Sequence, residues 1–449
     1  MYDLGIIGAG PAGYDAAEKA GHKGLKVVIF DKRNLGGVCL NEGCIPTKTL
    51  LYTAKLYENA LFGDKYGISC SNVSFDFEKM MDRKDKVVKK LVSGVAAKMK
   101  SVKAEVVIAE ASITERKSDH FLVKAGENIY ECKNILIATG SEAAVPPIKG
   151  LNKEYTLTNR EILQIRKLPK SINIIGGGVI GIEFAGFFNS MGVEVHVFEM
   201  LDEILPGIDK ELCVMLRNEL SKKGIDFHLG VKVEEVKGNS VIYSDKEGSH
   251  EISAEKLLIA VGRKVNVDGI GLERAGVEFT PKGIKIDNRC RTNIPNIYAA
   301  GDVTGFSLLA HTAYREAEVA VNNISGQKDI MRYDAIPGIV YTNPEISSVG
   351  LTEEEAVKRG IKIKKSSLPL AYAGRFIAEN EGKNGLIKVI IGEKYGEILG
   401  VHIIGNPSSE LIFGAAIAIE MQMRVKDIQE IVFPHPTVSE IFKEIAFTF

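Results

Sequence analysis

Cys39 and Cys44 are the residues whose types and spacing most directly suggest chemistry. They stand five residues apart, just after Gly36 and Gly37. Residues five apart on a regular helix lie roughly 140° apart around the axis, so a disulfide between them needs a distorted turn, which the glycines permit. A thiol pair near the start of a helix can hold a stabilised thiolate, and Lys48 could supply positive charge to it. The segment therefore predicts thiol–disulfide chemistry.

The remaining cysteines stand alone in the sequence. Six cysteines are too few for a disulfide scaffold in a chain of 449 residues, and a reducing compartment keeps most of them as thiols. We expect all four cysteines outside the Cys39–Cys44 pair to be buried, inert thiols, namely Cys70, Cys132, Cys213 and Cys290.

His435 and Glu440 form a second candidate pair. Pro436 disfavours helix at His435 and suits the first position of a helix that begins there. Glu440 would then lie early in that helix and could reach back to the imidazole. A carboxylate on one ring nitrogen fixes the tautomer and raises the basicity of the other nitrogen, as a catalytic base requires. A helix-capping acid beside an incidental histidine explains the same residues equally well.

Two glycine-rich segments repeat at an offset of 168 residues (176 − 8), each after an apolar strand and before a stretch compatible with a helix. In such a unit the first glycine makes a tight turn, the second lets the backbone approach a pyrophosphate, and the third allows the helix to pack on the strand. The helix N-terminus then meets the phosphates. The glycines are Gly8, Gly10 and Gly13 in the first segment and Gly176, Gly178 and Gly181 in the second.

An acid follows each glycine set by 18 residues, Asp31 in the first copy (31 − 13) and Glu199 in the second (199 − 181). A carboxylate at this place accepts hydrogen bonds from ribose hydroxyls and repels a 2′-phosphate. The two copies therefore predict two bound dinucleotides. The stretch from Glu199 to Asp209, which also contains Asp202 and Glu203, has no Lys or Arg, so the second site should prefer NAD over NADP through Glu199.

The pattern of strands and helices predicts the fold. Apolar strands at 135–140 and 257–262 repeat at an offset of only 122, so the first copy carries an insertion of 46 residues (168 − 122) between positions 35 and 100. Parallel strands that alternate with helices predict an α/β protein with doubly wound, Rossmann-like sheets. After about residue 332 we expect an α+β domain, with antiparallel strands at 338–341, 361–363, 386–391 and 398–404 and helices at 353–359 and 410–423.

A further apolar strand at 297–300 runs into Gly301 and Asp302, and a helix start follows at 308–311. Asp302 could bond a sugar-like chain, and the backbone amides near Ala310 could meet an electron-rich ring edge. His311 taken alone is more often an ordinary polar contact than a catalyst.

Composition excludes several classes of protein. The 57 Lys and Arg nearly balance the 58 Asp and Glu, so bulk charge suggests neither nucleic acid nor an anionic membrane as a partner. The longest apolar stretch noted near the C-terminus, 412–419, is far shorter than the roughly 20 residues that cross a bilayer. Because the first residues lead at once into a strand-like segment, we expect no cleaved leader and a cytoplasmic protein.

These motifs together resemble the pyridine nucleotide-disulfide oxidoreductase family along the whole chain, and within it the members that act on dihydrolipoyl groups. The resemblance implies FAD at the first glycine-rich segment and NAD at the second, and no metal. The implied FAD contacts are Gly8, Gly10, Gly13, Asp31, Lys48, Ala111, Thr139, Gly140, Ser141, Asp302 and Ala310. The implied NAD contacts are Gly176, Gly178, Gly181, Glu183, Glu199, Val233 and Gly262.

The resemblance also implies roles for the reactive residues. Cys39 would be the interchange thiol that meets substrate, Cys44 the thiol that faces the flavin, and the two would form a redox disulfide. His435 and Glu440 would be an acid–base pair that acts across a homodimer on the other subunit's disulfide. The implied reaction oxidises dihydrolipoyl groups to lipoyl and reduces NAD⁺ to NADH. Because the chain starts directly at its first strand, we expect the lipoyl group on another protein, in a 2-oxo acid dehydrogenase complex or the glycine cleavage system.

The implied domain order has four segments. Residues 1–145 form the first part of the FAD-binding domain with the redox insertion, and 146–264 form the NAD-binding domain. Residues 265–331 complete the FAD-binding or central domain, and 332–449 form an interface domain for dimerisation.

Departures from the family pattern are small, and alternatives remain. Phe433 stands where many members have an additional histidine, and Val38 where threonine is common. A glutathione-reductase-like enzyme would use NADPH, which the acids after Glu199 disfavour. A mercuric or large thioredoxin reductase would need a second cysteine pair near the C-terminus, and no cysteine follows Cys290. A flavoprotein subunit without turnover is also compatible with the fold, but it leaves the paired cysteines unexplained.

Overall fold

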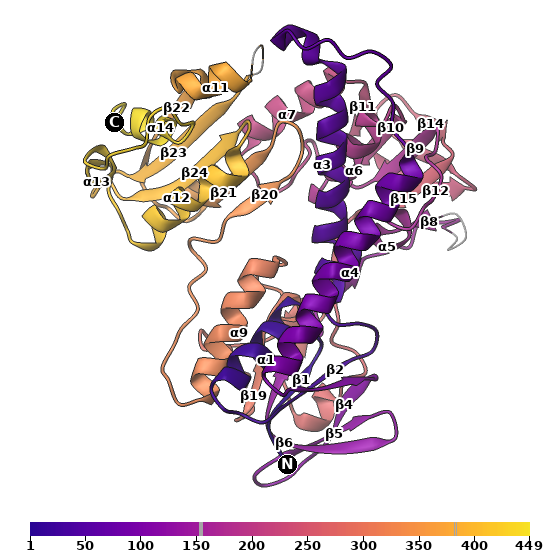
Figure 1. Cartoon of the computed structure of the whole chain (residues 1–449), viewed down its shortest axis with the longest axis vertical. Coiled ribbons are helices and arrows are strands. Elements are labelled where there is room, and N and C mark those ends of the chain that lie inside the picture. The colour runs from indigo at the N-terminus through magenta and orange to yellow at the C-terminus, as the bar shows by residue number, and fades with distance from the viewer. Residues whose placement is uncertain (152–155, 381, 383) are drawn as a thin grey trace. The chain divides into compact units, whose positions relative to one another are not determined.

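The computed structural model describes residues 1–151, 156–380, 382 and 384–449 (Figure 1). Two compact units emerge from the contacts within the chain. The first comprises Met1–Thr49, Lys79–Ala144 and Gly262–Arg332, and the second comprises Leu50–Glu78, Val145–Val261 and Tyr333–Phe449.

The first unit is built on a sheet with the strand order β3-β2-β1-β6-β5-β4, in which β19 also pairs with β6. The strands are β1 (Tyr2–Ile7), β2 (Val27–Asp31), β3 (Glu105–Ile108), β4 (Ala111–Arg116), β5 (Phe121–Ala125), β6 (Asn128–Ile137) and β19 (Ile297–Ala299). The strands β3, β2, β1, β6 and β19 run parallel, while β4 and β5 are antiparallel. Parallel strands are covered on both faces, which explains why β1 and β2 are nearly continuous apolar runs.

Helices α1 (Pro11–His22) and α9 (Ala310–Ile324) lie side by side beside this sheet (Figure 1). Small residues on α1 make this close packing possible, because Ala16, Ala17 and Ala20 are fully buried. The unit also contains β7 (Ser141–Ala143) paired with β16 (Arg263–Val265), β17 (Phe279–Thr280) paired with β18 (Gly283–Ile284), α8 (Leu272–Ala275) and the 3₁₀ turn η2 (Asp302–Thr304).

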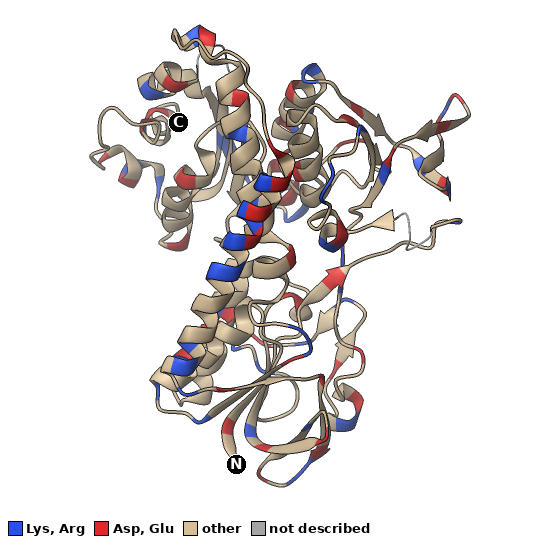
Figure 2. Cartoon of the chain, turned by 45° about the vertical axis from the view of Figure 1, so that its right-hand side comes forward, with Lys and Arg blue, Asp and Glu red and all other residues tan. Residues whose placement is uncertain are grey.

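The segment expected as an insertion is helical. It contains α2 (Gly37–Glu42), α3 (Cys44–Leu61), the 3₁₀ turn η1 (Gly63–Tyr66) and α4 (Phe77–Ser101). The helices α3 and α4 each contribute residues to both units. Figure 2 shows positions of Lys or Arg (blue) and of Asp or Glu (red) intermixed on the ribbon of the long helix α4.

In the second unit, the residues between 156 and 259 form a parallel sheet with the order β11-β10-β9-β15-β8. Its strands are β8 (Thr156–Leu157), β9 (Ser171–Ile175), β10 (Glu194–Glu199), β11 (Ile225–Leu229) and β15 (Lys256–Ile259). The connecting helices are α5 (Asn159–Ile162), α6 (Val179–Ser190) and α7 (Lys210–Lys222). An antiparallel meander of β12 (Lys232–Lys237), β13 (Ser240–Ser244) and β14 (Ser249–Ser253) shares a core with the sheet through Val236, Val241 and Tyr243.

The C-terminal part of the second unit contains an antiparallel sheet of order β20-β21-β24-β23-β22, with α12 packed on it (Figure 1). The strands are β20 (Gly338–Val340), β21 (Ile346–Gly350), β22 (Ile363–Pro369), β23 (Leu386–Gly392) and β24 (Ile398–Ile404). The helical elements are α10 (Glu353–Lys358), η3 (Leu370–Tyr372), α11 (Gly374–Glu379), α12 (Ser408–Glu420), α13 (Val425–Gln429) and α14 (Glu440–Ala446).

The expected fold class is confirmed: an α/β protein with two doubly wound parallel sheets and a C-terminal α+β part. The strand expected at 361–363 was wrong in extent, because β22 runs from Ile363 to Pro369. The edge strand β22 exposes Lys364 and Lys365, so its sequence lacks the apolar signal of an inner strand. None of the helices in the described part of the chain is both long and apolar enough to span a bilayer.

Lys388 on β23 is a buried cation surrounded by carboxylates. Its Nζ lies 2.9 Å from Asp209 and 3.3 Å from Glu211, and it also pairs with Glu353. The side chains of Lys388 and Asp209 are only 6% and 4% exposed. Burial lowers the pKa of Lys388, but the hydrogen bonds to Glu353 and Asp209 more than offset this effect and raise its pKa. The ion cluster therefore fastens α7 and α10 to β23.

Replacing Lys388 by Met should destabilise the protein, because it leaves the buried carboxylate of Asp209 without its cation. The expected loss is about 3–5 kcal/mol in the free energy of unfolding, measured by urea denaturation. Lys365→Met is the matched control, because Lys365 pairs with the same Glu353 from an exposed position and should cost less than about 1 kcal/mol. Equal losses in the two variants would contradict this account of the cluster.

Candidate active site

The two glycine-rich segments fold alike. Gly8 and Gly176 take φ angles of 109° and 112°, where a side chain is strained. A Cβ on Gly13 would lie 1.8 Å from the carbonyl oxygen of Gly8, and one on Gly181 would lie 2.0 Å from that of Gly176. The chain's own backbone therefore requires glycine at the first and third positions of both segments.

The middle glycines, Gly10 and Gly178, differ from their neighbours. Their backbones are extended, with φ of −75° at both, a conformation open to any residue. Among the described residues, a Cβ on Gly178 would meet nothing within 4 Å, and one on Gly10 would meet only the Cα of Gly37 at 3.8 Å. Because neither strain nor an internal clash calls for glycine here, the missing side chain leaves room for a ligand at the start of α1 and α6.

Asp31 and Glu199 stand at the carboxyl ends of β2 and β10, and they make the same hydrogen bonds. Each accepts one bond from its glycine-rich loop and one from the residue two places further along the chain. The bonds run from Ala9 N (2.8 Å) and Arg33 N (2.8 Å) to Asp31, and from Gly177 N (2.7 Å) and Leu201 N (2.9 Å) to Glu199. Both carboxylates are thus held beside the loops and retain lone pairs that can accept bonds from ribose hydroxyls.

The other acids that follow Glu199 are occupied within the protein. Each has a cation partner: Asp202 pairs with Lys210, Glu203 with Arg217, and Asp209 with Lys388. Asp209 also caps the N-terminus of α7. Of the acids in this run, Glu199 at the end of β10 is therefore the one left as the candidate for a ribose contact, and this role stays a prediction.

The helix that bears the two cysteines is broken between them. Cys39 lies on α2 and Cys44 is the first residue of α3, and Gly43 separates the helices with φ of −145° and ψ of −109°. The helix is thus distorted between the two cysteines, as a disulfide would require, and the break falls at Gly43. This break brings the Cys39 thiol within hydrogen-bonding distance of Cys44.

The start of α2 docks directly on the first glycine-rich loop. The amide of Gly36 donates a 2.8 Å hydrogen bond to the carbonyl oxygen of Ala9. A Cβ on Gly37 would lie 2.5 Å from the Cα of Gly10, so only glycine permits this approach. The fold therefore holds the thiol pair next to the place where the first loop can bind a dinucleotide.

The surroundings of the half-buried thiol pair adjust its acidity. The hydrogen bond to Cys44 and burial raise the pKa of the Cys39 thiol, while the positive charge of Lys48 opposes this shift. Burial lowers the pKa of Arg263, and the nearby acidic groups Asp302 and Cys44 oppose that shift. Lys48 thus lies within electrostatic range of Cys39, and Arg263 within range of Cys44, but the net shift keeps Cys39 protonated as a thiol.

Arg263 also organises a polar cluster that the sequence did not reveal. Its guanidinium donates to the hydroxyl and carbonyl oxygens of Ser141, both at 2.7 Å, and lies 3.7 Å from Asp302. The Ser141 hydroxyl in turn bonds to Asp302. The predicted residues Ser141 and Asp302, which are 161 positions apart, are thus brought together. The sequence holds one signal that could have pointed to Arg263: it directly follows Gly262, the glycine that comes shortly after strand β15.

Tyr14 on α1 and Tyr314 on α9 are further residues that the sequence did not reveal. Their hydroxyls are hydrogen bonded to each other. Burial raises the pKa of both phenols, and the charge of nearby Cys39 adds to the effect. The two rings therefore border the thiol pair. Neither tyrosine belongs to a recognisable motif, so only the packing of α1 on α9 could reveal this arrangement.

The remaining predicted contacts are placed as follows. Among the predicted FAD contacts, the hydroxyl of Thr139 donates to the carbonyl oxygen of Asn266 at 2.7 Å, and Gly140 follows it with φ of 67°. Ala111 is buried at the start of β4, and Ala310 is the first residue of α9. Among the predicted NAD contacts, Glu183 is buried on α6 and accepts a 3.0 Å hydrogen bond from the amide of Tyr341. Val233 lies on β12, and Gly262 follows β15 with φ of 123°. Their roles toward a cofactor stay predictions.

His435 and Glu440 are paired as expected. The Nδ1 of His435 lies 2.8 Å from one carboxylate oxygen of Glu440, and the other oxygen accepts a 2.9 Å bond from the amide of Thr437. Both bonds lower the pKa of Glu440, and the bond from the Thr437 amide has the larger effect. Glu440 therefore stays ionised and orients the ring. The expected helix start at Pro436 was wrong: α14 begins at Glu440, because Thr437 is engaged in a turn with Pro434 and Glu440.

The expectation for the unpaired cysteines holds in three of four cases. Cys132, Cys213 and Cys290 are buried, and burial raises the pKa of Cys132 and Cys213 to about 12 and that of Cys290 further. The expectation was wrong for Cys70, which is exposed. It lies between η1 and α4 in an irregular segment, where no periodicity reports burial.

Comparison with known proteins identifies the family. Residues 2–321 match the model of pyridine nucleotide-disulphide oxidoreductases, and residues 336–446 match the dimerisation domain of the same family. The chain is 39% identical over 453 residues to a dihydrolipoyl dehydrogenase of Bacillus subtilis, covering 99% of this chain and 95% of that protein. It is 38% identical over 447 residues to the dihydrolipoyl dehydrogenase of Geobacillus stearothermophilus, covering 98% and 94%.

Among solved structures, LpdA from Mycobacterium tuberculosis has the same fold, with a TM-score of 0.92, 24% identity and 99% of each chain covered. The duplicated glycine-rich loops, the thiol pair and the C-terminal domain thus agree with the sequence matches, and the chain belongs to the pyridine nucleotide-disulphide oxidoreductase family.

Proposed function

We propose that this protein is an NAD-dependent dihydrolipoyl dehydrogenase, which oxidises protein-bound dihydrolipoyl groups to lipoyl groups. The observation that carries the proposal is the Cys39–Cys44 pair docked on the first glycine-rich loop. A chain of nearly the same length and 39% identity that bears the name dihydrolipoyl dehydrogenase supports the choice of substrate.

The cofactors of this chain are FAD and NAD. The first loop, with Asp31 and the open face of Gly10, fits the pyrophosphate and ribose of FAD, and Lys48 and the Ser141–Asp302 cluster lie in the same unit. The second loop fits NAD through Gly178 and Glu199. When bound, the flavin supplies a carrier of two electrons between the thiol pair and NAD.

The chain's own residues account for the thiol half of the reaction. His435 of the partner subunit takes a proton from one substrate thiol, since a free thiol is only about 3% ionised at pH 7. The thiolate attacks Cys39 in the oxidised pair, so a new sulfur–sulfur bond forms and the Cys39–Cys44 bond breaks. The second substrate thiol then displaces Cys39, closing the lipoyl disulfide. Cys44 is released as a thiolate beside the charge of Arg263, and Cys39 accepts the proton of the second substrate thiol.

A homodimer fits the C-terminal domain. Residues 336–446 match a dimerisation domain. The His435 side chain is 80% exposed in the single chain. This exposure is unusual for a catalytic base, which normally acts in a site from which water is excluded. Phe413 and Ile417 on α12 and Met421, which caps its C-terminus, are also exposed and recur every four residues, so they form one apolar stripe. We infer that the second subunit covers this face, and that His435 enters the active site of that subunit.

The partner that supplies the dihydrolipoyl group is a lipoyl-bearing protein of a 2-oxo acid dehydrogenase complex or of the glycine cleavage system. A cytoplasmic location, expected from the sequence, stays a prediction.

The proposal is tested by the flavin spectrum of the purified protein. We expect anaerobic dihydrolipoamide to reduce the flavin and NAD⁺ to reoxidise it, whereas reduced glutathione and NADP⁺ should have little effect. Reduction by glutathione with a preference for NADPH would instead identify a glutathione-type reductase. A flavin that no dithiol reduces would indicate a subunit without turnover.

Replacing His435 by Gln should slow dihydrolipoamide oxidation by about 10²–10⁴-fold, the usual contribution of a general base. Oxidation of NADH by an artificial electron acceptor should change little, because that reaction needs no proton transfer at the substrate thiol. His120→Gln is the control, since His120 is also hydrogen bonded to a carboxylate, Asp119, at 2.8 Å. Steady-state kinetics of both reactions decide the matter, and equal losses in both would refute the role of His435.

Replacing Gly178 by Leu should weaken NAD binding by more than about 10-fold and leave the fold intact. The backbone at Gly178 is open to any residue, but a side chain would occupy the space assigned to the pyrophosphate. Gly181→Ala is the contrasting variant, because its Cβ would clash with the carbonyl oxygen of Gly176 and destabilise the protein. Isothermal titration with NADH and thermal melting separate these effects. Unchanged affinity in Gly178→Leu would place the dinucleotide elsewhere.

A further inference from the structure

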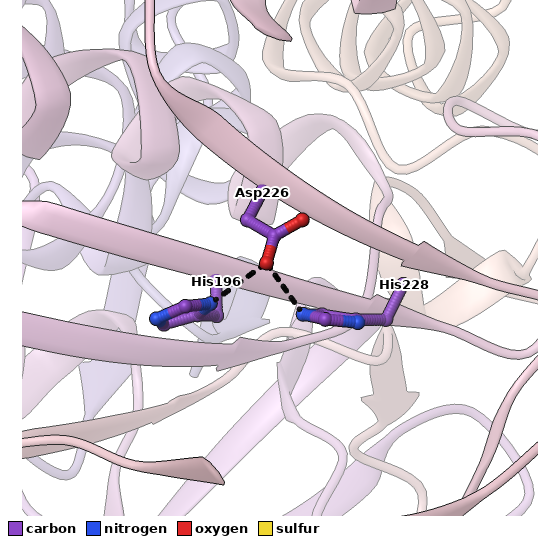
Figure 3. A group of neighbouring side chains, drawn as sticks. All are labelled: His196, Asp226 and His228. Atoms are coloured by element: carbon purple, nitrogen blue, oxygen red, sulfur yellow. Dashed lines mark hydrogen bonds and ion pairs between the residues drawn. The ribbon is translucent and has the colours of Figure 1, made fainter.

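Three side chains capable of binding a metal ion lie together on the parallel sheet of the second unit. His196 lies on β10, and Asp226 and His228 lie on the neighbouring edge strand β11. The strands are parallel, with His196 opposite Asp226 and Phe198 opposite His228. Because residues two apart on a strand point to the same side, all three side chains share one face of the sheet. Figure 3 shows the carboxylate of Asp226 over the gap between the two imidazole rings.

The distances suit a metal ion. One oxygen of Asp226, Oδ2, lies 3.3 Å from Nδ1 of His196 and 3.2 Å from Nε2 of His228. All three ligand atoms lie within 4.8 Å of one another. Ligand atoms around a tetrahedral ion at about 2.0–2.1 Å are about 3.3 Å apart. Two of the three separations therefore already match, and small rotations of the side chains would adjust the third.

One of these nitrogens lacks a hydrogen bond. The Nε2 of His228 is buried and makes no hydrogen bond in the described part of the chain, although the Asp226 oxygen is only 3.2 Å away. The carboxylate is thus close enough for attraction but not aligned for a hydrogen bond. A buried polar atom without a partner is costly, and an ion placed between the three groups would satisfy it.

The opposite nitrogen of each ring is already engaged. The Nε2 of His196 lies 3.3 Å from the carboxylate of Glu194, and the Nδ1 of His228 lies 3.2 Å from the hydroxyl of Tyr243. Metal-bound imidazoles commonly hydrogen bond through their second nitrogen in this way, which fixes the tautomer that leaves the first nitrogen free to bind the ion.

Packing holds both rings in place. Phe198 stacks on His228 at 4.8 Å between ring centroids, and the rings of His196 and His228 are 5.8 Å apart with 30° between their planes. The imidazoles are 14% and 15% exposed, whereas Asp226 is 57% exposed. The site is therefore rigid on the side of the rings and open to solvent on the side of the carboxylate, where an ion and its water can enter.

We propose that His196, Asp226 and His228 bind a divalent transition-metal ion such as Zn²⁺, with water completing the coordination. Two imidazole nitrogens and one carboxylate favour such ions over Mg²⁺ and Ca²⁺, which prefer oxygen ligands. The ion would link the edge strand β11 to β10, the strand that ends at Glu199. This inference goes beyond the proposed function, because it needs neither the thiol pair nor turnover.

The test measures Zn²⁺ binding to the full-length holoenzyme by isothermal titration. The protein is kept oxidised, so that Cys39 and Cys44 are closed in a disulfide and do not compete for the ion. We expect one Zn²⁺ per chain with a micromolar or tighter Kd that weakens at least about 10-fold in Asp226→Asn and in His228→Gln. His120→Gln is the matched control, because His120 also pairs with a carboxylate, Asp119, and should keep wild-type binding.

Thermal melting gives a second readout that does not depend on activity. Zn²⁺ should raise the Tm of the wild type and of His120→Gln but not that of Asp226→Asn, whose exposed side chain makes this variant the least disruptive to folding. If His228→Gln fails to fold, Asp226→Asn decides the question. Equal Zn²⁺ affinity in all variants, or no binding of the wild type below about 1 mM, would overturn the proposal.

Discussion

The close contact between the thiol-bearing helix α2 and the first glycine-rich loop is the constraint on which the rest of the site depends. At Gly37 the backbone approaches Gly10 so closely that a single Cβ would lie 2.5 Å from its Cα, and the Gly36 amide is bonded to Ala9. A side chain at Gly37 would push α2 away from the loop. The sulfurs would then lose their fixed position relative to the dinucleotide, and electron transfer depends strongly on such positioning.

The same loop architecture serves two chemical tasks in one chain. At an offset of 168 residues, Asp31 and Glu199 receive equivalent pairs of backbone hydrogen bonds from equivalent residues. What differs is the inserted segment that contains α2, α3 and α4, present in the first copy alone. Redox chemistry therefore arises from what packs on the loop and not from the loop itself.

Local sequence patterns were sufficient for the parts of the site that lie on contiguous segments. The glycine spacing, the acids Asp31 and Glu199 and the pairing of His435 with Glu440 are short-range features with a strong steric or electrostatic signature. Arg263 and Tyr314 were not predictable in this way, because each meets its partner across more than 100 residues of chain. The cluster of His196 with Asp226 and His228 depends on the register of β10 with β11, which no single segment encodes. The strand β22 and the helix α14 were misplaced where polar residues or a turn interrupt the periodicity.

The surroundings of Gly10 and Gly178 differ in one respect. A Cβ on Gly10 would lie 3.8 Å from the Cα of Gly37, whereas no described residue lies within 4 Å of the corresponding point at Gly178. A side chain at position 10 would therefore touch the start of α2 as well as a ligand on the loop, while one at position 178 would touch the ligand alone. Substitutions at position 178 thus act on the bound dinucleotide without disturbing the protein around it.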